Sequence, residues 1–254
     1  MIRIKRASSV ILVIVLASAA AGYGQQASLT DDQVNERLGF ITKALEAGQP
    51  RARTWRTGWI VGYSAGAATM GVLAATSWKK EVWTFADLIE EDNSFAQDML
   101  VGSATFALGV VGLVIDPFTP ATAAKKLRPL PETTALERQE KLARAEELLR
   151  ECARREKRGR GLTTHLLNAG VNAAAGVVTA AAFKRPWTDG LITFATGEAV
   201  SLLNIFTQPM RATRDLKEYE SGSAGNGGRP SAASKERNWS LGVWPGGLSF
   251  RLQF

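Results

Sequence analysis

The chain has 254 residues, a formal net charge of +7 and a sequence pI near 9.8. It contains one cysteine, Cys152, and one histidine, His165, which excludes an intrachain disulfide and a metal site built from several histidines. The positive charge favours anionic partners, and for an exported chain these are membrane lipid or envelope polysaccharide rather than nucleic acid. A purely solubilising role for the charge is an equally good interpretation.

Residues 1–24 have the composition of a secretory signal peptide, with a basic start, an apolar middle and a small-residue end. The basic residues are Arg3, Lys5 and Arg6, the aliphatic run is 10–16, and the pairs that fit a cleavage site are Ala19 with Ala21 or Gly22 with Gly24. We predict that this segment directs export and is then removed. An uncleaved membrane anchor is the alternative.

Two parts of the remaining chain are similar to each other, which indicates a tandem repeat. A shift of 104 residues aligns residues 36–84 with 140–188, and a shift of 88 aligns residues 102–119 with 190–207. The second alignment contains the pattern Gly-x-x-Thr-Phe-Ala-x-Gly in both copies. The two shifts differ by 16 residues, which predicts an insertion around 85–100 that forms a solvated loop. We therefore expect one helical repeat over 28–120 and a second over 130–216.

Each copy is expected to form one amphipathic helix followed by two apolar helices, so the predicted fold class is all-α with four apolar helices. Thr30 with Gln33, and Thr134 with Glu137, have the spacing of a capping box at a helix start. Apolar residues then recur at helical spacing in each copy. These stripes are Val34, Leu38, Ile41 and Leu45 in the first copy and Leu142, Ala145, Leu149 and Cys152 in the second. We expect Pro50 to end the first amphipathic helix or to begin the next one.

The apolar helices are long enough to cross a membrane. They correspond to 57–78, 99–115, 161–183 and 191–210, in which Glu198 is the only charged residue when His165 is neutral. Basic residues gather at one side of these hairpins, and the positive-inside rule would keep that side in the cytoplasm. A signal segment would place the same side outside. The chain therefore either passes into the periplasm as a soluble or peripheral bundle, or inserts against the rule, and we favour membrane association.

Glycines mark the faces on which the apolar helices would pack. Gly58, Gly62 and Gly66 recur every four residues and therefore line one helix face, and Gly170 provides similar small surface in the second copy. Such glycines let two helix backbones approach closely in a membrane, and also in a soluble bundle. They predict helix contacts without deciding between the two environments.

A polar cluster is predicted inside the second copy. His165, Asn168 and Asn172 lie about one turn apart on an apolar helix, and Glu198 lies on the next helix. Polar groups within apolar helices need partners. We expect hydrogen bonds that fix the register of the helices, and a proton-sensitive contact is the alternative.

The C-terminal part differs from the helices. Residues 217–238 are expected to form a flexible linker, and residues 239–254 a β-like tail in which Leu248, Phe250, Leu252 and Phe254 alternate with polar residues. The alternation with a final Phe resembles the closing strand of outer-membrane barrels over residues 248–254 only. This implies pairing with an envelope partner protein; an interfacial anchor or packing onto the helices are the alternatives.

The sequence contains no phosphate-binding Gly-Lys-Ser/Thr motif and no Cys/His cluster, so we predict no catalytic, cofactor-binding or metal-binding residues and no enzyme activity. The leading function is that of a non-catalytic, exported envelope protein, helical and membrane-associated, with a structural or interaction role. The alternative is a small channel-like or transporter-like membrane protein with a path past the polar cluster.

Overall fold

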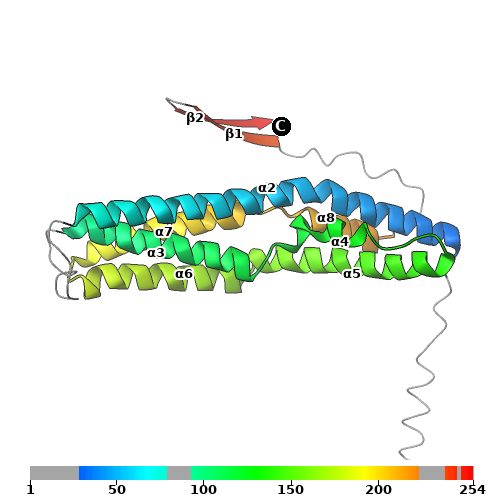
Figure 1. The fold of residues 1–254 in the computed structure, drawn as a ribbon, viewed down its shortest axis with the longest axis horizontal. Coiled ribbons are helices and arrows are strands. Elements are labelled where there is room, and N and C mark those ends of the chain that lie inside the picture. The colour runs from blue at the N-terminus through cyan, green and yellow to red at the C-terminus, as the bar shows by residue number, and fades with distance from the viewer. Residues whose placement is uncertain (1–28, 79–92, 223–237, 245–246, 254) are drawn as a thin grey trace, which may run out of the picture.

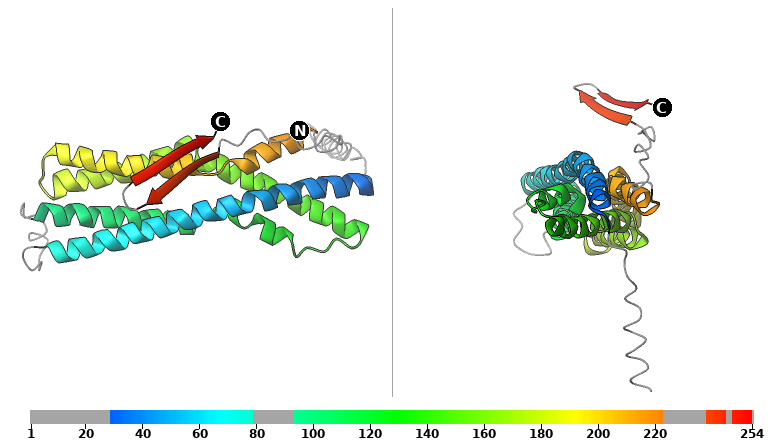
Figure 2. Two further views of the ribbon diagram at one scale, coloured as in Figure 1. Left: turned by 90° about the horizontal axis from the view of Figure 1, so that it is seen from above. Right: turned by 90° about the vertical axis from the view of Figure 1, so that its right-hand side faces the viewer.

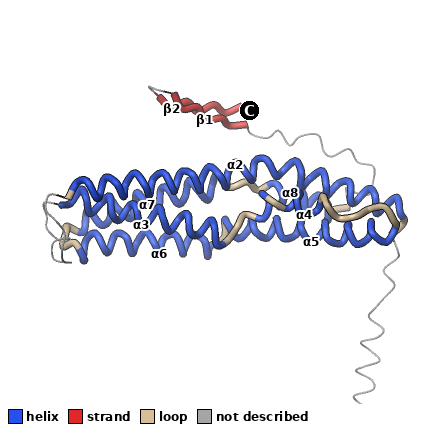
Figure 3. Tube along the Cα trace, in the orientation of Figure 1, coloured by secondary structure: helices blue, strands red, loops and turns tan. Residues whose placement is uncertain are grey.

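The computed structural model describes residues 29–78, 93–222, 238–244 and 247–253. The predicted signal peptide at 1–24 therefore lies outside the described residues, as do most of the predicted loop and linker. The described chain is an all-α helical bundle whose long helices run along one common axis, followed by a two-stranded hairpin (Figures 1 and 3).

The bundle consists of α-helices with one 3₁₀ turn and one π-helical segment. In chain order they are α2 (Asp31–Ser77), α3 (Ser94–Ile115), η3 (Thr119–Ala121), α4 (Ala123–Leu127), α5 (Ala135–Gly159), α6 (Leu162–Val177), η4 (Val178–Ala182), α7 (Trp187–Thr207) and α8 (Arg211–Glu220). The π-helical η4 continues directly from α6. Strands β1 (Asn238–Trp244) and β2 (Gly247–Gln253) pair antiparallel, with Trp239 opposite Leu252 and Leu241 opposite Phe250.

Helix α2 passes through Pro50 without a break and is 47 residues long. Our expectation that Pro50 ends a helix is therefore wrong. A proline inside a helix costs about 3 kcal/mol because it removes one backbone hydrogen bond and crowds the preceding turn. Buried residues on both sides, Leu45 before it and Trp55 after it, offset this cost because each anchors its half of α2 in a core cluster of its own.

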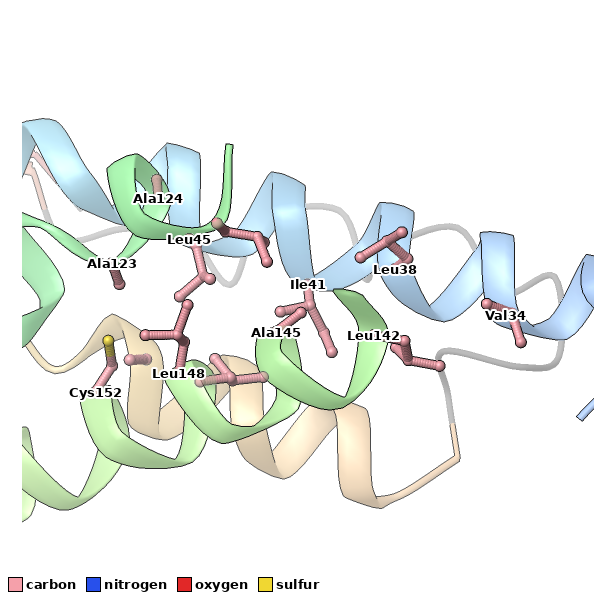
Figure 4. Close-up of a cluster of buried hydrophobic side chains, with 13 residues drawn as sticks. Val34, Leu38, Ile41, Leu45, Ala123, Ala124, Leu142, Ala145, Leu148 and Cys152 are labelled. Carbon is pink, nitrogen blue, oxygen red and sulfur yellow. The ribbon is translucent and has the colours of Figure 1, made fainter. Parts of the chain in front are cut away.

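One end of the bundle, which we call the basic end, has an ordinary apolar core. Both predicted capping boxes are present, so α2 and α5 begin where the sequence places them. Both predicted stripes are buried, and they pack against each other and against α4 and α8 (Figure 4). Densely charged faces surround this core, as the high content of Glu and Arg in α5 predicts.

The other end, which we call the apolar end, consists of two helical hairpins. The C-terminal part of α2 packs along α3, and α6 with η4 packs along α7. Figure 2 shows these two pairs as separate layers when the bundle is seen from above. Fewer contacts join one hairpin to the other, since α3 meets α6, η4 and α7 over short lengths only.

The C-terminal end of α5 connects the two ends of the bundle. Glu156 accepts hydrogen bonds from the backbone N–H groups of Ala212 (3.0 Å) and Thr213 (2.7 Å), and so caps the start of α8. Gln208 donates to the carbonyl of Glu156 at 2.9 Å. A Cβ at Gly159 would lie 2.1 Å from the Gln208 Oε1 atom, so a larger residue there would displace the Gln208 side chain.

Two predicted boundaries need correction. The insertion around 85–100 is not a loop throughout, because Ser94–Leu100 form the first turns of α3. Residues 217–220, expected to belong to the linker, are instead the last turn of the amphipathic helix α8, which packs on α5. Residues 85–92 and 223–237 lie outside the described residues.

Replacing Glu156 by Gln should change how stability depends on pH. Burial raises the pKa of Glu156 above its ordinary value, although the N–H groups of Thr213 and Ala212 act in the opposite direction. The stability contributed by a raised pKa is present below the ordinary pKa and is lost as the pH rises through the folded-state pKa. The parent should therefore lose stability relative to Glu156→Gln as the pH rises from acidic to neutral. The unfolding midpoints of the two proteins measure this difference. Glu140→Gln, an exposed change on the same helix, is the control, and a pH-independent difference for Glu156→Gln would contradict the assignment.

Candidate functional site

The apolar end has large apolar side chains on its outside. Of 21 exposed large apolar side chains among the described residues, all except Leu136 lie in the second half of α2, in α3, or in α6 to α7. Helices α2, α3 and α7 are long and apolar enough to cross a membrane, and little of their apolar windows is buried. Helix α6 has 16 residues and becomes π-helical at Val178, so it reaches a similar length only together with η4.

Inside the apolar end the two hairpins enclose a groove of about 910 Å³, a size within the range of small-molecule sites. Helices α3, α6 and α7 provide most of its wall, and α2 adds the side chains of Trp55, Tyr63 and Met70. The groove residues of α7 recur every three or four positions from Asp189 to Gln208. One face of α7 therefore lines the groove over its whole length.

Polar side chains form the floor of this groove, although the helices are apolar overall. The hydroxyl and amide groups that line it are those of Tyr63, Thr105, Thr164, Asn168, Asn172, Thr193, Thr196, Ser201, Asn204 and Gln208, of which Thr196 is exposed. The amide nitrogen of Asn204 is buried and has no hydrogen-bond partner. Within the described part of the chain, Asn168 and Thr196 also have no side-chain hydrogen bond. These three groups can bind a polar molecule in the groove.

Charged residues stand at both ends of the groove. At one end Arg155 donates to the carbonyl of Asp116 (3.0 Å) and pairs with its carboxylate (3.2 Å). At the other end Arg185 pairs with Asp189 (2.7 Å) and with Asp98. Each arginine is largely buried, so its carboxylate partner balances a charge that water does not fully solvate.

The rims of the groove are apolar and exposed. Leu108 on α3, Leu167 on α6 and Ile192 on α7 line the groove, and their exposed fractions are 55%, 66% and 65%. The groove is therefore open to the surroundings along its side and is not a closed pore. A molecule in it would meet polar groups on the floor and hydrocarbon at the rim.

The predicted polar cluster is brought together in part. Asn172 is buried and donates to Glu198 (2.9 Å) and to Ser201 (3.1 Å), which ties α6 to α7. Asn168 lines the same groove one turn away. His165 lies instead beside the ring of Phe206, with the ring centroids 6.3 Å apart. Of the three predicted cluster residues on α6, Asn172 is thus the one that binds Glu198.

The predicted packing glycines have different surroundings. A Cβ at Gly66 would lie 2.9 Å from the Phe106 ring, so Gly66 allows α2 and α3 to approach. Gly58, Gly62 and Gly170 have nothing within 4 Å of that position. For these three glycines a packing role remains a prediction, because no neighbour in the described chain uses their small size.

The closest approach of α6 and α7 was missed by the sequence analysis. A Cβ at Gly176 would lie 2.5 Å from the carbonyl oxygen of Gly190, and the reverse contact has the same distance. The signal for Gly190 was the Gly-x-x-Thr-Phe-Ala-x-Gly pattern, in which it is the first residue. The arginine and aspartate pairs at the groove ends were also missed, because they join residues 39 and 87 positions apart.

No protein-family model, curated protein or solved structure matches this chain, so the function has to be inferred from the site itself.

The Asn172–Glu198 hydrogen bond should couple the two residues energetically. We expect a double-mutant cycle with Asn172→Ala and Glu198→Ala to give a coupling of about 0.5–2 kcal/mol, the range of hydrogen bonds between apolar helices. The measurement is equilibrium unfolding of the purified protein by SDS in mixed micelles. His165→Ala with Glu198→Ala serves as the control cycle and should give additive effects. Coupling in the control and additivity in the Asn172 cycle would contradict the observed pairing.

Proposed function

We propose that this chain is an exported, non-catalytic envelope protein that inserts its apolar end into a membrane and keeps its basic end in water. The observation that carries the proposal is the reversal of polarity along the bundle. The basic end buries leucines and exposes charges, whereas the apolar end exposes leucines and lines its interior with hydroxyl and amide groups. Water disfavours an exposed apolar surface of this extent, and a bilayer favours it.

We also propose that the two halves are tandem repeats, each with one amphipathic helix and one apolar hairpin. Helices α2 and α5 begin 104 residues apart, and α4 and α8 begin 88 residues apart, which are the two shifts found in the sequence. Gly102 and Gly109 face the other helix of their hairpin, and so do Gly190 and Gly197, 88 residues later. The copies differ in one respect: the first copy has the single continuous helix α2 where the second copy has two helices, α5 and α6.

Exposed basic residues at the basic end support the proposal that this end binds an anionic partner. Lys125, Arg154, Lys157 and Arg158 are exposed on α4 and α5, next to the apolar end. At this level of a membrane they would meet lipid head groups, and each lysine or arginine contributes about 1 kcal/mol of attraction to an anionic surface. Envelope polysaccharide is a second anionic partner, and the C-terminal hairpin offers a strand edge to an envelope protein.

A transport role is the second candidate, and the groove favours it. A protein that served only as an anchor would gain from filling its interior with apolar side chains. Here the groove is lined by ten hydroxyl or amide side chains and has an ion pair at each end. Polar groups in the interior of a membrane domain mark substrate pathways.

A matched pair of lysine substitutions tests membrane insertion. Ala107 in the middle of α3 and Ala143 on α5 are both exposed helix residues, so in water Ala107→Lys and Ala143→Lys should each change stability by less than about 0.5 kcal/mol. In a bilayer, lysine at position 107 should cost about 3 kcal/mol because it lies in hydrocarbon. Alkaline carbonate extraction of membranes is the measurement. We expect the parent and Ala143→Lys in the pellet and reduced pelleting of Ala107→Lys. Release of the parent into the supernatant would disprove insertion.

A further inference from the structure

We infer that the groove is a path for the head groups of glycerophospholipids between the two leaflets of the membrane, with the acyl chains remaining in the bilayer. This inference rests on the proposed insertion of the apolar end and specifies the substrate of its second candidate role.

The length of the groove fits the thickness of a bilayer. Its residues on α7 extend from Asp189 to Gln208, and those on α3 from Asp98 to Asp116. At the helical rise these spans of 20 and 19 residues correspond to about 27–29 Å, close to the ~30 Å of a hydrocarbon core. The floor therefore offers polar groups at every depth that a head group must cross.

The cross-section of the groove fits an amphipathic molecule better than an ion or a sugar. A closed pore would need polar groups on all sides, but the rims at Leu108, Leu167 and Ile192 are apolar and exposed. A polar head on the floor and hydrocarbon chains across the rim match this arrangement. A fully polar solute in the groove would face the hydrocarbon of the lipid between the rims, which is unfavourable.

The floor can replace the water that a head group loses. A polar group moved into hydrocarbon without a partner costs several kcal/mol, which is the barrier to spontaneous lipid exchange. Asn168, Thr196 and Asn204 have unpaired side-chain groups along the groove, and they can bind phosphate and ester oxygens in turn. The described interior contains no fixed charge between the terminal ion pairs except Glu198, which accepts a hydrogen bond from Asn172.

The arginines at the two ends can bind the phosphate of a lipid in exchange for their carboxylate partners. Arg155 and Arg185 lie where the groove meets the head-group layers, and guanidinium binds phosphate through paired hydrogen bonds. A lipid phosphate would there compete with Asp116 at one end and with Asp98 and Asp189 at the other. Arg158, which also approaches Asp116 at 3.4 Å, adds positive charge at the basic end. The sequence contains no Gly-Lys-Ser/Thr phosphate-binding motif, and the inferred movement is passive and runs down the gradient of lipid between leaflets.

The test uses the full chain in vesicles of phosphatidylcholine and phosphatidylglycerol that contain a trace of lipid with a fluorescent head group. Dithionite bleaches only the outer leaflet, so protein-free vesicles lose half of the signal. We expect vesicles with protein to lose nearly all of it, while an entrapped dye stays inside and stays fluorescent. Flotation and carbonate extraction of the same vesicles establish insertion independently.

Floor and matched control variants separate a specific path from general disturbance of the bilayer. Asn168→Leu with Thr196→Leu removes two unpaired floor groups, and we expect bleaching of the inner leaflet to become roughly tenfold slower. Ala169→Leu with Ala195→Leu introduces the same two leucines at neighbouring residues that do not line the groove, and should keep the parent rate.

Three results would overturn the inference. Inserted protein that leaves the inner leaflet protected shows that the groove does not carry lipid, while the proposed membrane insertion stands. Equal slowing by the floor and control variants removes the groove from the path. Ion flux without lipid exchange would assign the groove to a closed conduit instead.

Discussion

The carbonyl groups at the end of α7 and the N–H groups at the start of α8 need hydrogen-bond partners. Side chains at the C-terminal end of α5 provide them. Glu156 binds two N–H groups at the start of α8, and Arg160 donates to the carbonyls of Phe206 and Gln208. These bonds lie at the level where the interior changes from leucine to hydroxyl and amide side chains. Without them the helix ends would be buried and unsatisfied, which is costly at the boundary of an apolar environment.

Hydrogen bonds at the same level of the bundle also hold the first hairpin against α7. Trp55 and Trp59 of α2 both donate to the hydroxyl of Thr207 on α7, at 3.2 and 3.1 Å. Trp55 packs on Phe118, and the Arg155 guanidinium lies over that ring, 5.6 Å from its centroid. Tryptophan and arginine at one level of a bundle are typical of the interface between hydrocarbon and water. In the proposed arrangement, the level of the bundle at which α7 meets α8 therefore lies at the membrane surface.

Local patterns predicted much of the basic end, because helix caps and apolar stripes depend on residues three or four positions apart. Thr30, Thr134 and the buried stripe from Val34 to Leu45 are examples. The continuity of α2 through Pro50 was not predictable in this way, since the compensating contacts of Trp55 and Leu45 come from distant parts of the chain. The groove was missed for the same reason. Asn168 and Asn172 signalled a polar interior, but Asp116, Arg155 and Arg185 reach it only through the packing of helices that are far apart in sequence.

The unbroken α2 and the interrupted chain from α5 to α6 make the two hairpins mechanically unequal. The first hairpin is rigidly connected to the basic end through α2, because bending this continuous helix would strain consecutive backbone hydrogen bonds. The second hairpin is attached by two short non-helical joints at one level, around Gly161 and Pro209. Rotation at those joints requires only a few dihedral angles to change. Thermal breathing that widens or narrows the space between the hairpins therefore concentrates in the second one, while the first serves as the fixed frame.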